Sequence, residues 1–130
     1  VHTALAAAGA ARTPGLRISV QIVGLRAGRT LNRRYRGKDA PTNVLSFAGP
    51  GAIDSGEHML GDIVICAPVL AREARLQGKR LAAHWAHIAV HGTLHLLGHD
   101  HLRPRQAAVM EALETQIIES MGFSDPYGRF

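Results

Sequence analysis

The sequence predicts an α+β fold in which a small mixed β-sheet is flanked by about five helices. Three observations support this prediction: short stretches with the two-residue period of strands, longer stretches with three- and four-residue apolar spacing, and Gly or Pro at the junctions. A chain of 130 residues is usual for one domain, and it shows no internal repeat or linker. We therefore expect residues 1–130 to form a single domain.

Three short strands are predicted in the first half of the chain. Apolar and polar residues alternate over residues 17–23, and Gly24 ends the pattern. A second short strand is expected over residues 44–47, and residues 62–66 form an apolar third strand. Because residues 48–58 are rich in Gly and Pro, we expect them to form a mobile surface loop that borders the functional site.

Helices are predicted where apolar residues recur every three or four positions. The predicted segments are residues 1–11, 26–36, 68–77, 81–97 and 104–121. Pro68 and Pro104 can begin helices because a residue in the first turn needs no N–H partner, and Gly98 can end one. In the second of these helices, Leu31 and Tyr35 are expected to lie on one face among arginines. The opening segment lacks the basic flank and the hydrophobic stretch of a signal peptide.

The composition excludes two classes of protein. Hydrophobic residues make up 46% of the chain and charged residues 19%, and no run of eighteen apolar residues occurs, so neither disorder nor a membrane span is expected. Cys66 is the single cysteine, so no intrachain disulfide can form and a reducing compartment is expected. We therefore expect a cytoplasmic protein in which Cys66 is a small buried hydrophobic residue.

Basic residues are concentrated at the start of the chain. The net charge is +5, and residues 1–38 contain eight of the fifteen Lys and Arg residues but no Asp or Glu. This distribution favours contact with nucleic acid or phosphate, whereas the alternative is a solvated basic face. The residues that we expect to make such contacts are Arg29, Arg33, Arg34, Arg36 and Lys38.

The histidines predict a metal site. Five of the eight histidines recur at three- or four-residue steps between positions 84 and 99. Residues four apart lie on one face of a helix, so His91 and His95 can bind one cation together. Gly98 can then turn the chain back, so that His101 supplies a third ligand. Three protein ligands leave one position of a tetrahedral zinc ion open, which is the pattern of a catalytic site.

The spacing His-x3-His-x2-Gly-x2-His also matches the metzincin metalloproteases, but one element is missing. Those proteases carry Glu directly after the first histidine as general base, and this sequence has Gly92 there. Asp100 is placed to orient a ligand histidine or to cap the turn. His99 is left open as a spare ligand, a proton donor or an exposed residue. His84 and His87 are expected to be ordinary hydrogen-bonded residues.

Most of the chain resembles the YbeY family of bacterial metal-dependent endoribonucleases. The resemblance rests on residues 31–47 (LNRRYRGKDAPTNVLSF), 60–66 (LGDIVIC), 83–101 (AHWAHIAVHGTLHLLGHDH) and 110–118 (MEALETQII). Two positions depart from the family pattern: Ala48 replaces a proline, and His99 replaces a tyrosine.

The resemblance implies a fold similar to the zincin core, with a zincin-like metal-site helix. It implies that one zinc ion binds to His91, His95 and His101, and that Arg36 is functionally important. The implied activity is cleavage of single-stranded RNA, in 3′-end maturation of small-subunit rRNA and in ribosome quality control. The implied partners are rRNA of the small subunit, ribosomal proteins and a ribosome-associated GTPase, and no membrane.

These features together suggest a mechanism and two alternatives. We expect the four residues Arg36, His91, His95 and His101 to be catalytic, with Arg36 stabilising the charge that develops on the phosphate. Either a metal hydroxide or the RNA 2′-hydroxyl acts as nucleophile, and the sequence does not choose between them. A zinc metallopeptidase and a non-catalytic, metal-stabilised ribosome assembly factor are the alternative functions.

Overall fold

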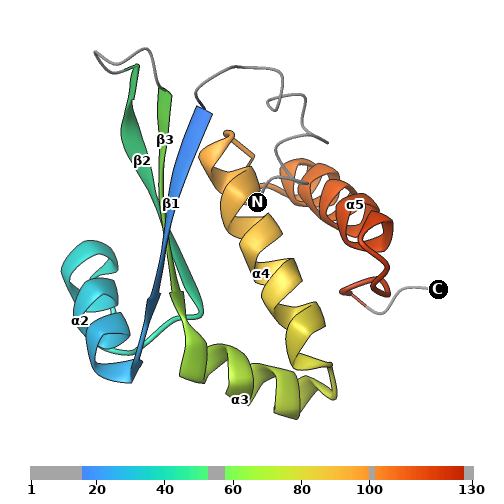
Figure 1. Cartoon of the computed structure of the whole chain (residues 1–130), viewed down its shortest axis with the longest axis horizontal. Coiled ribbons are helices and arrows are strands. Elements are labelled where there is room, and N and C mark those ends of the chain that lie inside the picture. The colour runs from blue at the N-terminus through green and yellow to red at the C-terminus, as the bar shows by residue number, and fades with distance from the viewer. Residues whose placement is uncertain (1–15, 53–57, 100–101, 128–130) are drawn as a thin grey trace.

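The computed structural model describes residues 16–52, 58–99 and 102–127, which form three strands and four helices (Figure 1). In chain order these elements are β1 (Leu16–Val23), α2 (Leu25–Arg36), β2 (Val44–Ala52), β3 (His58–Cys66), α3 (Ala67–Gln77), α4 (Leu81–Leu96) and α5 (Pro104–Ser120). The α+β class and the small sheet are therefore confirmed. The fifth helix, predicted for residues 1–11, lies outside the described residues.

The sheet is mixed, with β3 between the two outer strands. Its order is β1-β3-β2, β1 runs parallel to β3, and β2 runs antiparallel to it. Because β3 is covered on both faces, it reads as an almost continuous apolar run rather than an alternating one. Ile63, Val64, Ile65 and Cys66 are all buried. The prediction that Cys66 is a small buried residue is confirmed.

Helices cover both faces of this sheet (Figure 1). α2 lies on one face and contacts β3, whereas α4 lies on the other face and contacts β2 and β3. α5 packs on the far side of α4, and α3 runs past one end of the sheet. α4 is thus sandwiched between the sheet and α5, which explains why its sequence is apolar on more than one side.

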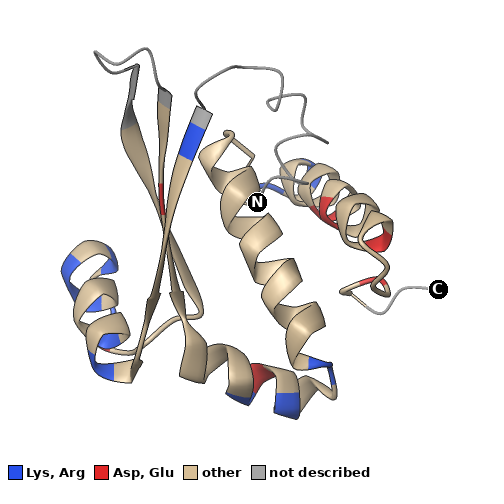
Figure 2. Ribbon diagram, in the orientation of Figure 1, with Lys and Arg blue, Asp and Glu red and all other residues tan. Residues whose placement is uncertain are grey.

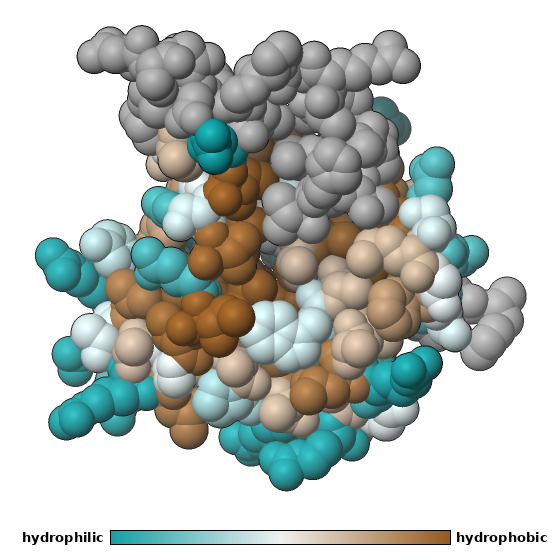
Figure 3. Space-filling model, viewed as in Figure 1, coloured by the Kyte–Doolittle hydropathy of each residue, from teal (hydrophilic) through white to brown (hydrophobic). Residues whose placement is uncertain are grey.

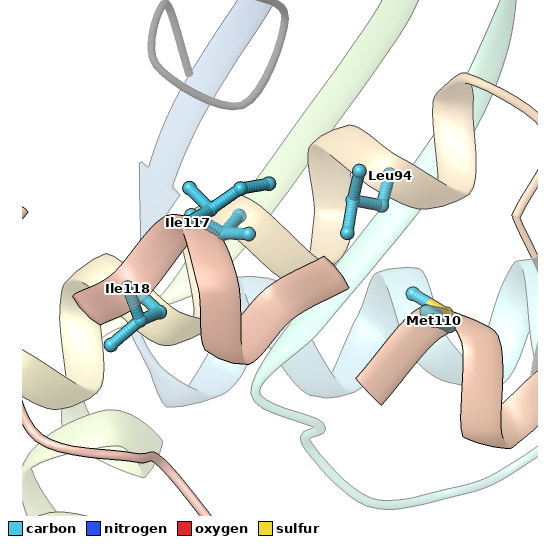
Figure 4. Close-up of a cluster of buried hydrophobic side chains, with 5 residues drawn as sticks. Leu94, Met110, Ile117 and Ile118 are labelled. Carbon is cyan, nitrogen blue, oxygen red and sulfur yellow. The ribbon is translucent and has the colours of Figure 1, made fainter. Parts of the chain in front are cut away.

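Two hydrophobic clusters meet at α4. The first joins the sheet, α3 and α4, and its buried members are Ile63, Ile65, Leu70 and Ile88. The second joins α4 to α5, and its buried members are Val90, Leu94, Met110, Ile117 and Ile118; Figure 4 shows Leu94 on α4 facing the α5 side chains. The position of α4 is therefore fixed from two sides, by the sheet on one and by α5 on the other.

Apolar side chains also reach the surface over β1, where Val20 and Ile22 are exposed (Figure 3).

The loop predicted for residues 48–58 is wrong at residues 48–52, which belong to β2, and at His58, where β3 begins, while residues 53–57 lie outside the described residues. A Cβ atom at Gly49 would lie only 2.6 Å from the carbonyl oxygen of Met59, so glycine lets the two strands approach closely. The register also shifts between Ala48 and Gly51. At residues 48–52 the Gly-rich sequence therefore marks an irregular strand rather than a loop.

The apolar face expected on α2 is only partly buried: Leu31 is half-buried, and the Tyr35 ring meets Phe47 edge to face with centroids 5.0 Å apart. Tyr35 is 53% exposed, and the buried residues of α2 are Gly28 and Asn32. A Cβ atom at Gly28 would lie 3.1 Å from Cys66 Sγ, and Asn32 Nδ2 donates a hydrogen bond to the carbonyl oxygen of Ala40 at 2.7 Å. α2 thus packs through a small residue and a satisfied amide, which hydrophobic spacing does not reveal.

The boundaries of all four helices agree with the predicted boundaries to within one residue. Pro104 begins α5 as predicted, and α4 ends at Leu96, one residue before the predicted end. Val109 is 55% exposed, so it does not belong to the buried stripe of α5. None of the helices within the described ranges is long and apolar enough to span a membrane.

Candidate functional site

The histidine pair lies on the C-terminal half of α4. His91 and His95 are one turn apart, and their Nε2 atoms lie 3.1 Å from each other. The rings meet edge to face with centroids 4.6 Å apart. Two imidazole nitrogens bound to one tetrahedral zinc ion at 2.0–2.1 Å lie about 3.3 Å apart. The pair therefore has the spacing and donor atoms that suit a zinc ion.

The chain turns back directly after this pair, as predicted. Gly98 has φ of 95°, a conformation that glycine adopts without strain, and its N–H donates to the carbonyl oxygen of His95. The N–H of His99 donates to the carbonyl oxygen of Leu94 at 3.0 Å. These two bonds close the end of α4 and redirect the chain.

His101 and Asp100 lie outside the described residues, so the third predicted ligand stays a prediction. Within residues 16–52, 58–99 and 102–127, no group of three His, Cys, Asp or Glu side chains could hold a metal ion. His101, the third ligand that the sequence predicts, is not part of these ranges.

A buried carboxylate lies behind His91. Glu114 on α5 places Oε1 2.7 Å from His91 Nδ1, the ring nitrogen that faces away from His95. Its other oxygen, Oε2, accepts hydrogen bonds from His87 Nε2 at 2.9 Å and from the Tyr127 hydroxyl. Burial raises the pKa of Glu114, but the hydrogen bonds from His87, His91 and Tyr127 outweigh it and lower this pKa to about 2. The carboxylate is therefore ionised at neutral pH.

Sequence reasoning missed Glu114, although the sequence held a signal for it. Met110 and Ile117 are seven residues apart and lie on one face of α5, and Glu114 falls four residues after the first and three before the second. A charged residue on an apolar helix face is fully buried only where other side chains pair with it, so its presence there is a signal of buried partners. Glu114 has no exposed surface, and its partners come from α4 and from the segment that follows α5.

The other α4 histidines differ in role. His84 is buried, and its Nε2 lies 2.9 Å from Glu73 Oε1 on α3, which confirms that it is an ordinary hydrogen-bonded residue. His87 is buried and hydrogen-bonded as well, but its partner is Glu114. His87 is therefore part of the group that surrounds His91.

Gly92 is packed against the sheet. A Cβ atom at this position would lie 3.1 Å from Ile63 Cγ2 and 3.3 Å from both Ser46 Oγ and Val44 Cγ2. A side chain on residue 92 would thus point into the interface between α4 and the sheet. The glutamate that metalloproteases carry at this position would force these neighbouring side chains to move. Glu114 does not replace it as a base, because Glu114 is buried behind His91.

Arg36 is connected to α4 through β2. It is the last residue of α2, and its Nη2 donates a hydrogen bond to the carbonyl oxygen of Ser46 at 3.4 Å. The Ser46 hydroxyl in turn donates to the carbonyl oxygen of Gly92 at 3.2 Å, next to His91. The structure thus brings the exposed guanidinium of Arg36 to the strand that contacts α4, the helix that carries His91 and His95.

The remaining candidate basic residues lie along α2 and the turn that follows it (Figure 2). All of them are exposed: Arg29, Arg33, Arg34 and Lys38. Arg29 forms two bonds of 2.8 Å to the two carboxylate oxygens of Asp39. The hydrogen bond between them raises the pKa of Arg29 and lowers that of Asp39. Part of the positive charge on this face is therefore already balanced within the protein.

A cavity of about 280 Å³ lies apart from the histidine pair. It is lined by the turn between α3 and α4 and by the segment after α5, including Lys79, Arg80, His87 and Phe123. None of the candidate ligands lines it. Lys79 Nζ donates to the carbonyl oxygen of Pro126 at 2.6 Å, so this lysine joins the two walls. The cavity therefore does not include the histidine pair, although it shares His87 with the group around His91.

Comparison with known proteins identifies the family. The family model described as Endoribonuclease YbeY matches residues 1–122. A relative named Endoribonuclease YbeY, from Alkalilimnicola ehrlichii, is 52% identical over 129 residues, which cover 98% of this chain and 76% of the relative. The solution structure of a Thermotoga maritima protein aligns with a TM-score of 0.59 and 26% identity, covering 88% of this chain and 79% of that one. The chain belongs to the YbeY endoribonuclease family.

Proposed function

We propose that this protein is a zinc-dependent endoribonuclease that cleaves single-stranded RNA, acting in 3′-end maturation of small-subunit rRNA and in ribosome quality control. The relative from Alkalilimnicola ehrlichii is named for endoribonuclease activity, which supports the reaction class. The structural observation that supports it most is the chain of contacts from Arg36 through Ser46 to Gly92, because it joins the cationic helix to the histidine pair.

The metal would be held by His91, His95 and His101, with α4 as a zincin-like metal-site helix. The 3.1 Å separation of the His91 and His95 Nε2 atoms and the carboxylate behind His91 both fit a zinc ion. When bound, zinc would supply a Lewis acid for the scissile phosphate. Gly92 supplies no proton acceptor next to His91, so proton transfer does not use that position.

Arg36 would pair with the scissile phosphate. A guanidinium presents a planar fork that can donate two hydrogen bonds to phosphate oxygens. The hydrogen bond from Arg36 to the Ser46 carbonyl oxygen holds the guanidinium next to β2, the strand that contacts α4. From there Arg36 would stabilise the negative charge that develops on the phosphate. Arg33, Arg34 and Lys38 would bind the RNA backbone beyond the cleavage point, while Arg29 does so less because Asp39 pairs with it.

The partners that we propose are rRNA of the small ribosomal subunit, ribosomal proteins and a ribosome-associated GTPase. The cationic surface of α2 supports the first of these, because phosphate neutralisation dominates nucleic-acid affinity. We place the activity in the cytoplasm, in keeping with a single free and buried cysteine, Cys66.

The direct test compares RNA cleavage by the wild-type protein and by a His95→Ala variant, purified side by side. A Gln116→Ala variant, altered at an exposed position of α5, serves as the matched control for purification. We expect the wild type and the control to cleave single-stranded RNA, double-stranded RNA to resist, and His95→Ala to be inactive. Equal cleavage by all three proteins would reveal a contaminating nuclease and contradict the proposal. RNA binding without cleavage would favour the assembly factor, and peptide cleavage would favour the peptidase.

A further inference from the structure

Glu114 makes three hydrogen bonds, and each comes from a different part of the site. Oε1 faces His91 Nδ1 at 2.7 Å, whereas Oε2 faces His87 Nε2 at 2.9 Å and the Tyr127 hydroxyl. The side chain is fully buried between α4 and α5. An unpaired carboxylate in such a place would be costly, so the three donors and the carboxylate hold one another in position.

We propose that Glu114 is a positioning residue that fixes the tautomer of His91, so that the lone pair on His91 Nε2 faces His95. A carboxylate can only accept hydrogen bonds, and therefore the Nδ1 atom of His91 carries the proton. A neutral imidazole has one N–H, so Nε2 is left with its lone pair. That lone pair is directed toward the space shared with His95 Nε2, 3.1 Å away.

The position of Glu114 in the fold explains why this carboxylate is a positioning residue and not a catalytic one. Only about 1% of its side chain is exposed, and it lies on the side of His91 that faces away from His95. Substrate on the open side of the histidine pair therefore cannot touch it. Its effect reaches the reaction only through the orientation and protonation of the His91 ring.

Tyr127 and His87 keep the carboxylate from turning away from His91. Tyr127 is itself held by its backbone N–H, which donates to Asp125 Oδ1 at 2.8 Å. His87 lies one turn before His91 on α4, so both histidines approach the same carboxylate from one helix face. The segment after α5 is in this way part of the candidate metal centre, although it lies far from it in sequence.

The tautomer can be measured by nitrogen NMR of the metal-free protein at a pH near 8, where free imidazole is neutral. We expect His91 of the wild type to show one tautomer, with the proton on Nδ1. In Glu114→Gln the amide can present either its oxygen or its NH2 group to His91, so both tautomers are expected. Zinc affinity of the same variant should fall by about 10- to 100-fold.

Glu119→Gln is the matched control. It makes the same change at an exposed position of α5, away from the Glu114 hydrogen bonds, so the single tautomer and the zinc affinity should be retained. A wild-type His91 that carries its proton on Nε2 would overturn the inference, and this holds even if Glu114→Gln does not fold. A Glu114→Gln protein with the wild-type tautomer and zinc affinity would overturn it as well. The expected fall in zinc affinity rests on the proposed function. A wild-type protein that binds no zinc would refute that function. The tautomer of His91 would still decide the role of Glu114.

Discussion

Arg36 Nη2 lies 3.4 Å from the carbonyl oxygen of Ser46, and the hydroxyl of the same serine reaches the backbone of α4 at Gly92. This relationship separates Arg36 from the other basic residues of α2. Arg29 is directed at Asp39, and Arg34 lies over the Tyr35 ring with its guanidinium carbon 5.5 Å from the centroid. Of these three, Arg36 is the one with a hydrogen bond to β2, the strand that packs against the helix of His91 and His95. We therefore expect it to serve the reaction more than it serves RNA affinity.

Arg36→Ala should lower the rate of RNA cleavage with little effect on folding. If Arg36 stabilises the transition state, its loss should reduce single-turnover cleavage by on the order of a hundredfold. Melting temperature and zinc content should hardly change, because the side chain is exposed and is not one of the proposed ligands. The rate should be measured at saturating protein, so that weakened binding is compensated.

Arg34→Ala is the control for this measurement, since it removes an equal charge from the same helix. It should cleave at nearly the wild-type rate once RNA is saturated. An Arg36→Ala protein with the wild-type saturated rate would reduce Arg36 to an ordinary member of the basic surface.

Gly92→Glu should destabilise the protein and should not create a peptidase. The new side chain would enter the contact between α4 and the sheet, where Ile63 and Val44 leave no room for even a Cβ atom without adjustment. An unpaired buried charge costs about 3–5 kcal/mol of the free energy of unfolding. Denaturant unfolding should show this loss, and turnover of unstructured peptides should be absent with zinc present.

Ala82→Glu supplies the comparison, because it introduces the same side chain at an exposed position of α4. Its stability should remain within about 0.5 kcal/mol of the wild type. Equal stabilities of the two variants would show that residue 92 does not face the sheet.

Local patterns predicted most of the elements, because the spacing that identifies a strand or a helix is contained within it. The ends of β2 and β3 could not be obtained this way. Their pairing depends on Gly49 lying close to the backbone at Met59, a contact between strands that appears in the sequence only as an excess of glycine. The buried face of α2 was missed for a related reason, since Gly28 and Asn32 carry no hydrophobic signal.

The candidate site was predicted in part. His91 and His95 share a helix, so their spacing alone brings their Nε2 atoms together. Glu114 is 23 residues from His91 and reaches it only because α5 packs on α4. No local pattern encodes that packing. The charge on α2 was visible in the sequence, but the pairing of Arg29 with Asp39 depends on how the turn after α2 folds back.

Asp39→Asn should strengthen RNA binding and make it more dependent on salt. Asp39 forms two bonds to Arg29 and lies 4.0 Å from Arg33, so its charge offsets the cationic face of α2. Removing it frees Arg29 to meet a phosphate, and each added phosphate contact with single-stranded nucleic acid steepens the slope of log affinity against log salt by about 0.7. Titrations at several salt concentrations would measure this slope.

Glu119→Gln removes the same charge from an exposed position on α5 and is the matched variant for this comparison. It should leave the slope nearly unchanged, because long-range effects are screened at ordinary salt. If both variants change RNA affinity equally, net charge rather than the Arg29–Asp39 pair governs binding.

Zinc should raise the melting temperature of the wild-type protein, and this gain should shrink as the solution is made acidic. A ligand that binds only the folded state at a hundred times its dissociation constant stabilises it by about 2.7 kcal/mol. His91 and His95 would bind zinc through unprotonated nitrogens, so protons should compete with zinc for both rings and weaken its binding at low pH. His95→Ala should show little or no zinc-induced rise, while Gln116→Ala on the exposed side of α5 should respond as the wild type does.

Melting curves with and without zinc across a pH series, together with elemental analysis of gently purified protein, would measure these effects. A wild-type protein that contains no metal and melts at the same temperature with and without zinc would refute the metal centre.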